Sequence, residues 1–237
     1  MSVYVLGVSR DSDARSLESQ IPHQASVSSS GVPACRDESP DNGRPDWVFS
    51  GPLAAAVVHA THSPLSPDAH ARTLAAIHQQ FCILPMRYGT VLDGEEAVRT
   101  MLQTRGRDLV GSLQQLGGSC ELGVRIVLAH PTVPEPKSHH VTRSATNYLS
   151  WRRARYERED ALGNRADGVT QKLVEATDGL YRQWRRLASS SPDLLRLSFL
   201  VEQVRIVAFR NRVQTMDLAT SGDKCAVLGP WPPFSFV

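Results

Sequence analysis

The 237-residue sequence has no long hydrophobic run, and this absence excludes several classes of protein. No stretch approaches the roughly 20 apolar residues that a membrane-spanning helix needs. The apolar stretch at residues 3–8 is too short for a secretion signal, and no basic region precedes it. The sequence therefore predicts a protein without a membrane partner.

Cysteine is also scarce, and the four thiols form no C-x-x-C pair. Disulfide frameworks belong to short, cysteine-dense secreted chains, which this chain does not resemble. Cys82 and Cys120 fall at expected strand positions, where a small apolar side chain packs well. We therefore expect a cytoplasmic protein of a reducing compartment. The four residues are Cys35, Cys82, Cys120 and Cys225.

An excess of charge of one sign is missing as well. The chain has 26 basic and 24 acidic side chains, a net charge of +2, and only three of the basic residues are lysines. So balanced a charge is atypical of a protein defined by nucleic-acid binding. Hydrophobic residues make up 41% and charged residues 21%, which excludes wholesale disorder.

The common catalytic motifs are absent. The chain has no serine elbow, phosphate-binding loop or dinucleotide fingerprint. His59 and His62 end an apolar strand, and His70 and His78 are eight residues apart without the H-E-x-x-H pattern of a zinc site. We therefore expect no metal, no cofactor and no catalytic residue. The protein is predicted not to be an enzyme.

The first 130 residues have the pattern of an α+β domain. Residues 22–45 are rich in serine, glycine and proline and predict a mobile loop. Ser66, Pro67 and Asp68 predict a helix start, and Asp93 with Glu96 resembles a capping box. The expected strands are residues 3–8, 46–50, 54–60, 83–91 and 120–128, with helices after Ser66 and Asp93.

Three prolines at 131, 134 and 136 predict an extended linker over residues 131–142. Beyond it, residues 143–228 predict a second α+β domain with a long helix. Apolar residues recur every three or four positions from Leu162 to Leu187, which indicates about 39 Å of helix. Strands at 194–201 and 224–228 flank a helix at 206–216. The fold class is thus α+β, with two α+β domains and a tail at 229–237.

Two segments are not explained by ordinary packing. Arg87 stands in an apolar strand, so we expect it to be buried and anchored by a carboxylate or by carbonyl groups. Trp231, Phe234 and Phe236 place three aromatic rings among the prolines of the tail, and so apolar a tail should dock. Our prediction is that it covers a sheet face of the C-terminal domain, and a partner is the competing choice.

An arginine-rich stretch favours a different function. Residues 143–186 hold nine arginines and one lysine against six acids, with tryptophan and tyrosine interleaved. Such a helix could grip single-stranded nucleic acid. The six acids weaken the positive electrostatic field of the stretch. A nucleic-acid or regulatory binding module is therefore the alternative function and not the first choice. Binding that falls steeply with salt would support it.

The same two unusual segments carry a resemblance. Leu84-Pro-Met-Arg-Tyr-Gly-Thr-Val91, an acidic helix start and Gly118-Ser-Cys-Glu-Leu-Gly-Val-Arg125 resemble the central pattern of the gas vesicle protein L/F family. Gly229-Pro-Trp-Pro-Pro-Phe-Ser-Phe-Val237 is similar to the terminal signature of that family. Phe199-Leu-Val-Glu202 and Phe209 match the segment before it.

The resemblance implies a non-enzymatic accessory or minor structural protein of gas vesicle assembly, located in the cytoplasm and at the gas vesicle. It implies two α+β domains of ferredoxin-like character. It also implies binding of the small hydrophobic shell subunit, to shield it or to nucleate the wall, and contact with other accessory proteins. A shell subunit with a large apolar face would otherwise aggregate. Arg87, Trp231, Phe234 and Phe236 are the candidate anchor or partner-binding residues.

Overall fold

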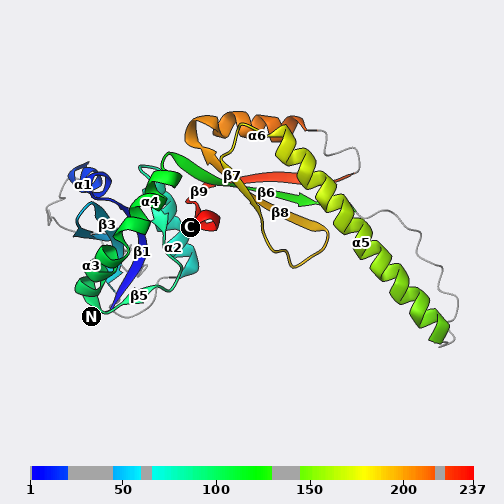
Figure 1. Ribbon diagram of the computed structural model, residues 1–237, viewed down its shortest axis with the longest axis horizontal. Coiled ribbons are helices and arrows are strands. Elements are labelled where there is room, and N and C mark those ends of the chain that lie inside the picture. Colours follow the sequence, from blue (N-terminus) through cyan, green and yellow to red (C-terminus); the bar gives the residue numbers. More distant parts are fainter. Residues whose placement is uncertain (1, 21–44, 60–65, 130–144, 217–221) are drawn as a thin grey trace, which may run out of the picture. The chain divides into compact units, whose positions relative to one another are not determined.

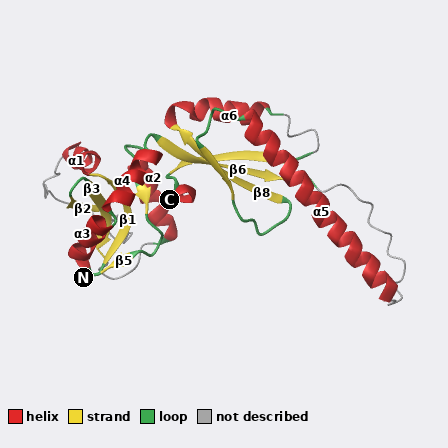
Figure 2. Ribbon diagram, viewed as in Figure 1, coloured by secondary structure: helices red, strands yellow, loops and turns green. Residues whose placement is uncertain are grey.

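The computed structural model describes residues 2–20, 45–59, 66–129, 145–216 and 222–237. The chain contains helices and two antiparallel sheets, which confirms the predicted α+β class (Figures 1 and 2). The contacts divide the chain into two compact units. The first comprises Met1–Ser119 and Trp231–Val237, and the second comprises Cys120–Pro230. The predicted loop at 22–45, apart from its last residue, and the predicted linker at 131–142 lie outside the described residues.

The first unit is built on an antiparallel sheet in the order β2-β3-β1-β4, with β5 also paired to β1. Its strands are β1 (Val3–Arg10), β2 (Asp46–Ser50), β3 (Leu53–His59), β4 (Leu84–Pro85) and β5 (Val91–Leu92). Its helices are α1 (Asp11–Gln20), α2 (Pro67–His78), α3 (Gly94–Thr104), α4 (Gly106–Leu116) and the short η3 (Phe234–Phe236).

Helix α2 begins where the sequence predicts. The Ser66 hydroxyl accepts a hydrogen bond from the Ala69 amide at 3.1 Å, and Pro67 occupies the first turn. The apolar face of α2 then packs on β1 and β3 through five buried residues: Leu6, Ala56, Leu74, Ile77 and Ile83. The predicted capping box at the start of α3 is wrong, because the Asp93 side chain makes no capping hydrogen bond.

Glycine is required at one point of the central strand β1. The register of β1 against β3 shifts between Val5 and Gly7. A Cβ atom on Gly7 would lie 2.7 Å from the Leu84 carbonyl oxygen and 2.8 Å from the Ile83 side chain. The bulge and the missing side chain let β4 approach β1, and this approach positions the turn that follows β4.

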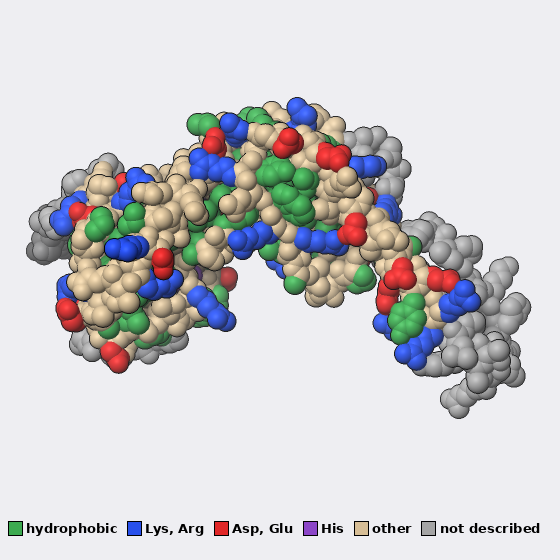
Figure 3. Space-filling model, viewed as in Figure 1, with side chains coloured by type: hydrophobic (Ala, Val, Ile, Leu, Met, Phe, Trp, Pro, Cys, Tyr) green, Lys and Arg blue, Asp and Glu red, His purple; other side chains and the backbone are tan. Residues whose placement is uncertain are grey.

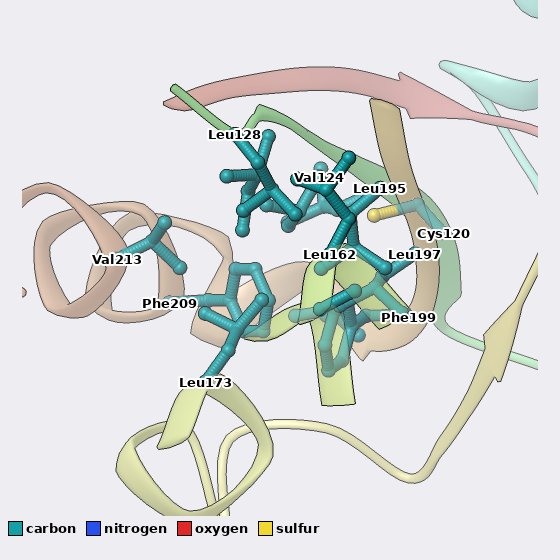
Figure 4. Packing of buried hydrophobic residues seen from close by; sticks show 14 residues of the cluster. Cys120, Val124, Leu128, Leu162, Leu173, Leu195, Leu197, Phe199, Phe209 and Val213 are labelled. Atoms are coloured by element: carbon teal, nitrogen blue, oxygen red, sulfur yellow. The ribbon is translucent and has the colours of Figure 1, made fainter. Parts of the chain in front are cut away.

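The second unit has a four-stranded sheet in the order β7-β8-β6-β9. Its buried cluster holds Cys120, Val124, Leu173, Phe199 and Phe209, among others (Figure 4). The Phe199 and Phe209 ring centroids are 5.0 Å apart. The elements are β6 (Ser119–Val127), α5 (Ala145–Ala176), β7 (Gln183–Arg186), β8 (Leu194–Glu202), η1 (Gln203–Arg205), α6 (Ile206–Thr215) and β9 (Lys224–Trp231).

Two expectations for this region are wrong. The strand β6 was expected in the N-terminal domain, but it lies between β8 and β9, so the boundary between the units falls at residues 119–120. The long helix ends at Ala176 instead of continuing to Leu187. Gly179, with φ of +74°, turns the chain, and Trp184 then lies in strand β7. The apolar period continues across this turn in the sequence, but all four residues of β7 are exposed, whereas Leu180 and Tyr181 in the turn pack against the core.

Candidate partner-binding surface

Arg87 lies in a tight turn that is fixed at both ends to the central strand. The Met86 amide donates to the Leu6 carbonyl at 2.8 Å, and the Val5 amide donates to the Thr90 carbonyl at 3.0 Å. Within the turn, the Thr90 amide and hydroxyl both donate to the Arg87 carbonyl, at 3.1 and 2.6 Å. The turn is therefore a rigid projection of the sheet.

The expectation that Arg87 is buried is wrong. Its side chain is exposed, and no described carboxylate pairs with its guanidinium. The reason is that β4 has only two residues, so the chain leaves the sheet at Met86 before it reaches the arginine. Beside it, Tyr88 is 46% exposed and its ring packs edge-to-face with the ring of His70, with centroids 5.6 Å apart.

In the tail, two of the prolines are buried and two of the aromatic rings are exposed to solvent. Pro232 and Pro233 are buried, whereas Trp231 is 37% exposed and Phe234 is 42% exposed. Phe236 is half-buried. The short helix η3 closes with the Phe234 amide donating to the Pro232 carbonyl at 2.7 Å and the Phe236 amide donating to the Pro233 carbonyl at 3.1 Å.

The predicted docking of the tail on the C-terminal domain is wrong. Residues 231–237 belong to the first unit, which also contains the Arg87 turn. The structure thus brings all four predicted site residues into one compact unit. The burial of the prolines explains the difference: they supply the attachment that we had assigned to the aromatic rings.

The histidines and cysteines do not gather at one place in the described part of the chain. No group of three or more possible metal ligands occurs there. His70 and His78 are buried on α2, and burial lowers the pKa of both. Burial raises the pKa of the Cys120 thiol to about 11 and also raises the pKa of Cys82, so neither thiol is an activated nucleophile. Cys82 lies in the loop before β4, not in a strand.

The first unit also has a cleft of about 660 Å³ between the β2–β3 turn and the junction of α3 and α4. No pattern in the sequence predicts this cleft. Gly106 and Gly111 line it, and a Cβ atom on either would meet nothing within 4 Å. Among the described lining residues Arg107 is the only charged one, and none is an acid, a histidine or a cysteine. The cleft therefore offers no acid–base pair.

The arginines of the long helix are mostly compensated. Arg153 pairs with Glu157 at 2.8 Å, and Arg155 pairs with Glu159 at 2.9 Å. Further along, Arg165 pairs with a buried aspartate. These pairs remove much of the positive field that nucleic-acid binding needs, so the alternative function gains no support.

Glu121 on β6 is only 5% exposed, although it is a charged residue in a strand whose other face is apolar. Its Oε1 accepts a hydrogen bond from the Ser198 hydroxyl at 2.6 Å, across to β8. Alternation along the strand shows which residues share a face, but it cannot show that both faces are covered. This buried carboxylate lies in the segment that carries the family resemblance.

Comparison with known proteins decides the family. The profile described as Gas vesicle synthesis protein GvpL/GvpF matches residues 2–237. The chain belongs to the GvpL/GvpF family. Gas vesicle protein L of Streptomyces sp. (strain CB03234) is 30% identical over 181 residues, which are 71% of this chain and 67% of that protein. Gas vesicle protein F of the same strain is 29% identical over 210 residues, 80% and 86% of the two chains.

Solved structures of GvpL/GvpF relatives share the fold. The crystal structure of the gas vesicle protein GvpF from Anabaena sp. PCC7120 matches with a TM-score of 0.72 at 17% identity, covering 99% of this chain and 95% of that one. The GvpF structure from Microcystis aeruginosa gives 0.69 at 13% identity, covering 99% and 98%. No described helix of this GvpL/GvpF chain is long and apolar enough to cross a membrane.

Proposed function

We propose that the protein is a non-enzymatic accessory or minor structural component of gas vesicle assembly that binds the small hydrophobic shell subunit in the cytoplasm and at the gas vesicle. Membership of the GvpL/GvpF family supports the assembly role. The observation that carries the binding proposal is the tail, whose buried prolines hold Trp231 and Phe234 with their rings toward solvent.

Such a tail suits a binding element for physical reasons. Aromatic rings supply large contact areas and dominate the free energy of many interfaces. A segment that is already fixed loses little conformational entropy when it binds. Burial of the proline rings against the first unit fixes the tail before any partner arrives. Val237, 59% exposed, extends the apolar surface.

The test is co-purification of the shell subunit with the full chain at high salt. We expect the double variant Trp231→Ala/Phe234→Ala to retain at least about tenfold less shell subunit, since each ring contributes roughly 1.5–3 kcal/mol when buried. Trp184→Ala is the matched control, because Trp184 is 38% exposed and lies in the second unit. Its binding should equal that of the wild type.

Two results would contradict the proposal. In one, the double variant retains the shell subunit as well as the wild type does. In the other, Trp184→Ala loses it to the same extent, which would indicate nonspecific adhesion of exposed aromatic rings. Arg87→Ala belongs in the same series, because Arg87 projects from the first unit and has no described acidic partner. We expect it to weaken binding without changing the stability of the protein.

A further inference from the structure

The first half of α5 stands apart from the core of its own unit. Among the α5 side chains that the structure describes, the first to join the buried cluster is Leu162. Figure 1 shows this half of the helix continuing past the sheet of the second unit. From Arg152 to Ala161, every side chain that the structure describes is exposed. We call residues 152–160 the arm.

The charges of the arm are antisymmetric about Tyr156. Arg152 and Asp160 lie four residues before and after it, Arg153 and Glu159 three, and Arg155 and Glu157 one. Three of the four mirror pairs thus join a base to an acid. The fourth pair is Ala154 and Arg158.

Five of these residues share one face of the helix. Arg152, Arg153, Tyr156, Glu159 and Asp160 have the spacing i, i+1, i+4, i+7, i+8. All five are exposed, and Tyr156 at the centre is 51% exposed. In the space-filling view, charges of both signs gather on this part of α5 around a hydrophobic side chain (Figure 3).

We propose that this face is a self-association surface, on which the arm of a second copy of this chain lies antiparallel and crosses at Tyr156. In that arrangement, a residue n positions before Tyr156 faces the residue n positions after it in the other copy. Arg152 then faces Asp160 and Arg153 faces Glu159, and two-fold symmetry doubles each pair. A parallel arrangement would oppose like charges, so the pattern selects the antiparallel one.

The proposed pairing between two copies does not require the contacts within each arm to break. Within one chain, Arg153 and Arg155 pair with acids four residues later, and Arg152 donates to the Tyr156 hydroxyl at 3.1 Å. Asp160 has no ion pair among the described residues. A second copy would supply an acid for Arg152 and a base for Asp160. This proposal does not depend on the proposed shell-subunit binding.

The first experiment measures the molar mass of the full chain in solution at about 100 μM. We expect the wild type to be dimeric in low salt and monomeric at 1 M salt, since exposed pairs are screened. Two double variants would bring like charges together between two identical copies. Arg152→Glu/Arg153→Glu makes the whole face acidic, and Glu159→Arg/Asp160→Arg makes it basic. Each alone should dimerise at least about tenfold more weakly than the wild type.

Mixing the two variants is the decisive step. Their faces are complementary, with the same number of opposed charges as the wild-type pair, so the equimolar mixture should form a heterodimer. Lys172→Glu is the control: it changes an exposed charge of α5 outside the arm and should leave the dimer intact. Circular dichroism must show that every variant keeps its helix content.

A cross-link tests the crossing point itself. With Cys35 and the exposed Cys225 both changed to serine, Tyr156→Cys should form an intermolecular disulfide under mild oxidation, and Lys172→Cys should not. A wild type that stays monomeric, variants that dimerise unchanged, or a mixture that fails to associate would each overturn the proposal. Binding of single-stranded nucleic acid by the wild type that falls steeply with salt, with no heterodimer from the mixed variants, would overturn it in favour of a nucleic-acid surface.

Discussion

The Arg165 guanidinium on α5 donates to the carboxylate of Asp223, the residue before β9, with Nη2 and Oδ1 2.7 Å apart. The Asp223 side chain is 2% exposed. The same pair holds the end of β6, because the Ala129 amide donates to Asp223 at 2.8 Å and Arg165 donates to the Ala129 carbonyl at 2.7 Å. One ion pair thus joins a helix and two strands of the second unit.

Replacing the arginine of this pair should destabilise the protein strongly. Arg165→Met leaves a buried carboxylate without its cation, so we expect the free energy of unfolding to fall by about 3 kcal/mol. Urea denaturation at pH 7 measures it. Arg153→Met is the control, because the side chain of Arg153 is 82% exposed and its pair lies within one helix. Equal losses for both variants would contradict the role assigned to Asp223.

Gly7 and Gly111 should respond oppositely to alanine. Gly7→Ala forces a Cβ atom against the Leu84 carbonyl and the Ile83 side chain, and we expect a loss of about 1–3 kcal/mol. At Gly111, in α4, a Cβ atom meets nothing within 4 Å, so alanine should stabilise the helix by up to about 1 kcal/mol. Thermal unfolding of the two variants in parallel distinguishes these outcomes.

In the turn after β4, the backbone should matter more than the arginine. Arg87→Ala should change stability by less than about 0.5 kcal/mol, because the side chain is exposed. Gly89 has φ of +82°, so Gly89→Ala should cost about 1–2 kcal/mol. If Arg87→Ala costs as much as Gly89→Ala, the arginine has a structural role that its exposure conceals.

Acidification should destabilise the first unit through α2. Burial lowers the pKa of His70 and His78 below the value of 6.5 that they have in the unfolded chain. Both are neutral in either state well above pH 6.5, so stability is greatest there. As pH falls below 6.5 the unfolded state binds protons first, and stability decreases.

His78 provides the sharper test of this pH dependence, because neither ring nitrogen has a hydrogen-bond partner among the described residues. We expect His78→Leu to lose less stability than the wild type between pH 7.5 and 5.5. Urea midpoints at the two pH values measure the difference. Identical losses in the two proteins would assign the pH dependence to other groups.

The sequence predicted the fold class and most elements because their signals are local. The Ser66 cap and Pro67 at the start of α2 are examples, because each acts on its neighbouring residues. It did not predict which sheet β6 joins, since a strand pattern does not name its partner. The apolar period also passed unchanged from α5 into β7, which concealed the end of the helix at Ala176.

The candidate site was predicted by residue but not by environment. Arg87 and the three tail aromatics stand out in the sequence because their side chains do not suit their neighbours, and all four residues belong to the first unit. Burial of Arg87 depended on how far β4 extends, and two residues of strand were too few to bury it. The exposure of the tail aromatics depended on contacts far along the chain, which no local pattern encodes.

The first unit contains residues from both ends of the sequence, with the whole second unit between them. During synthesis, residues 1–119 therefore leave the ribosome well before residues 231–237, the segment that completes their unit. Until then, the surface that receives Pro232 and Pro233 is open to water and to other proteins. Completion of the first unit is thus timed by translation, and a ribosome that stalls within the second unit leaves a nascent chain whose first unit lacks its tail.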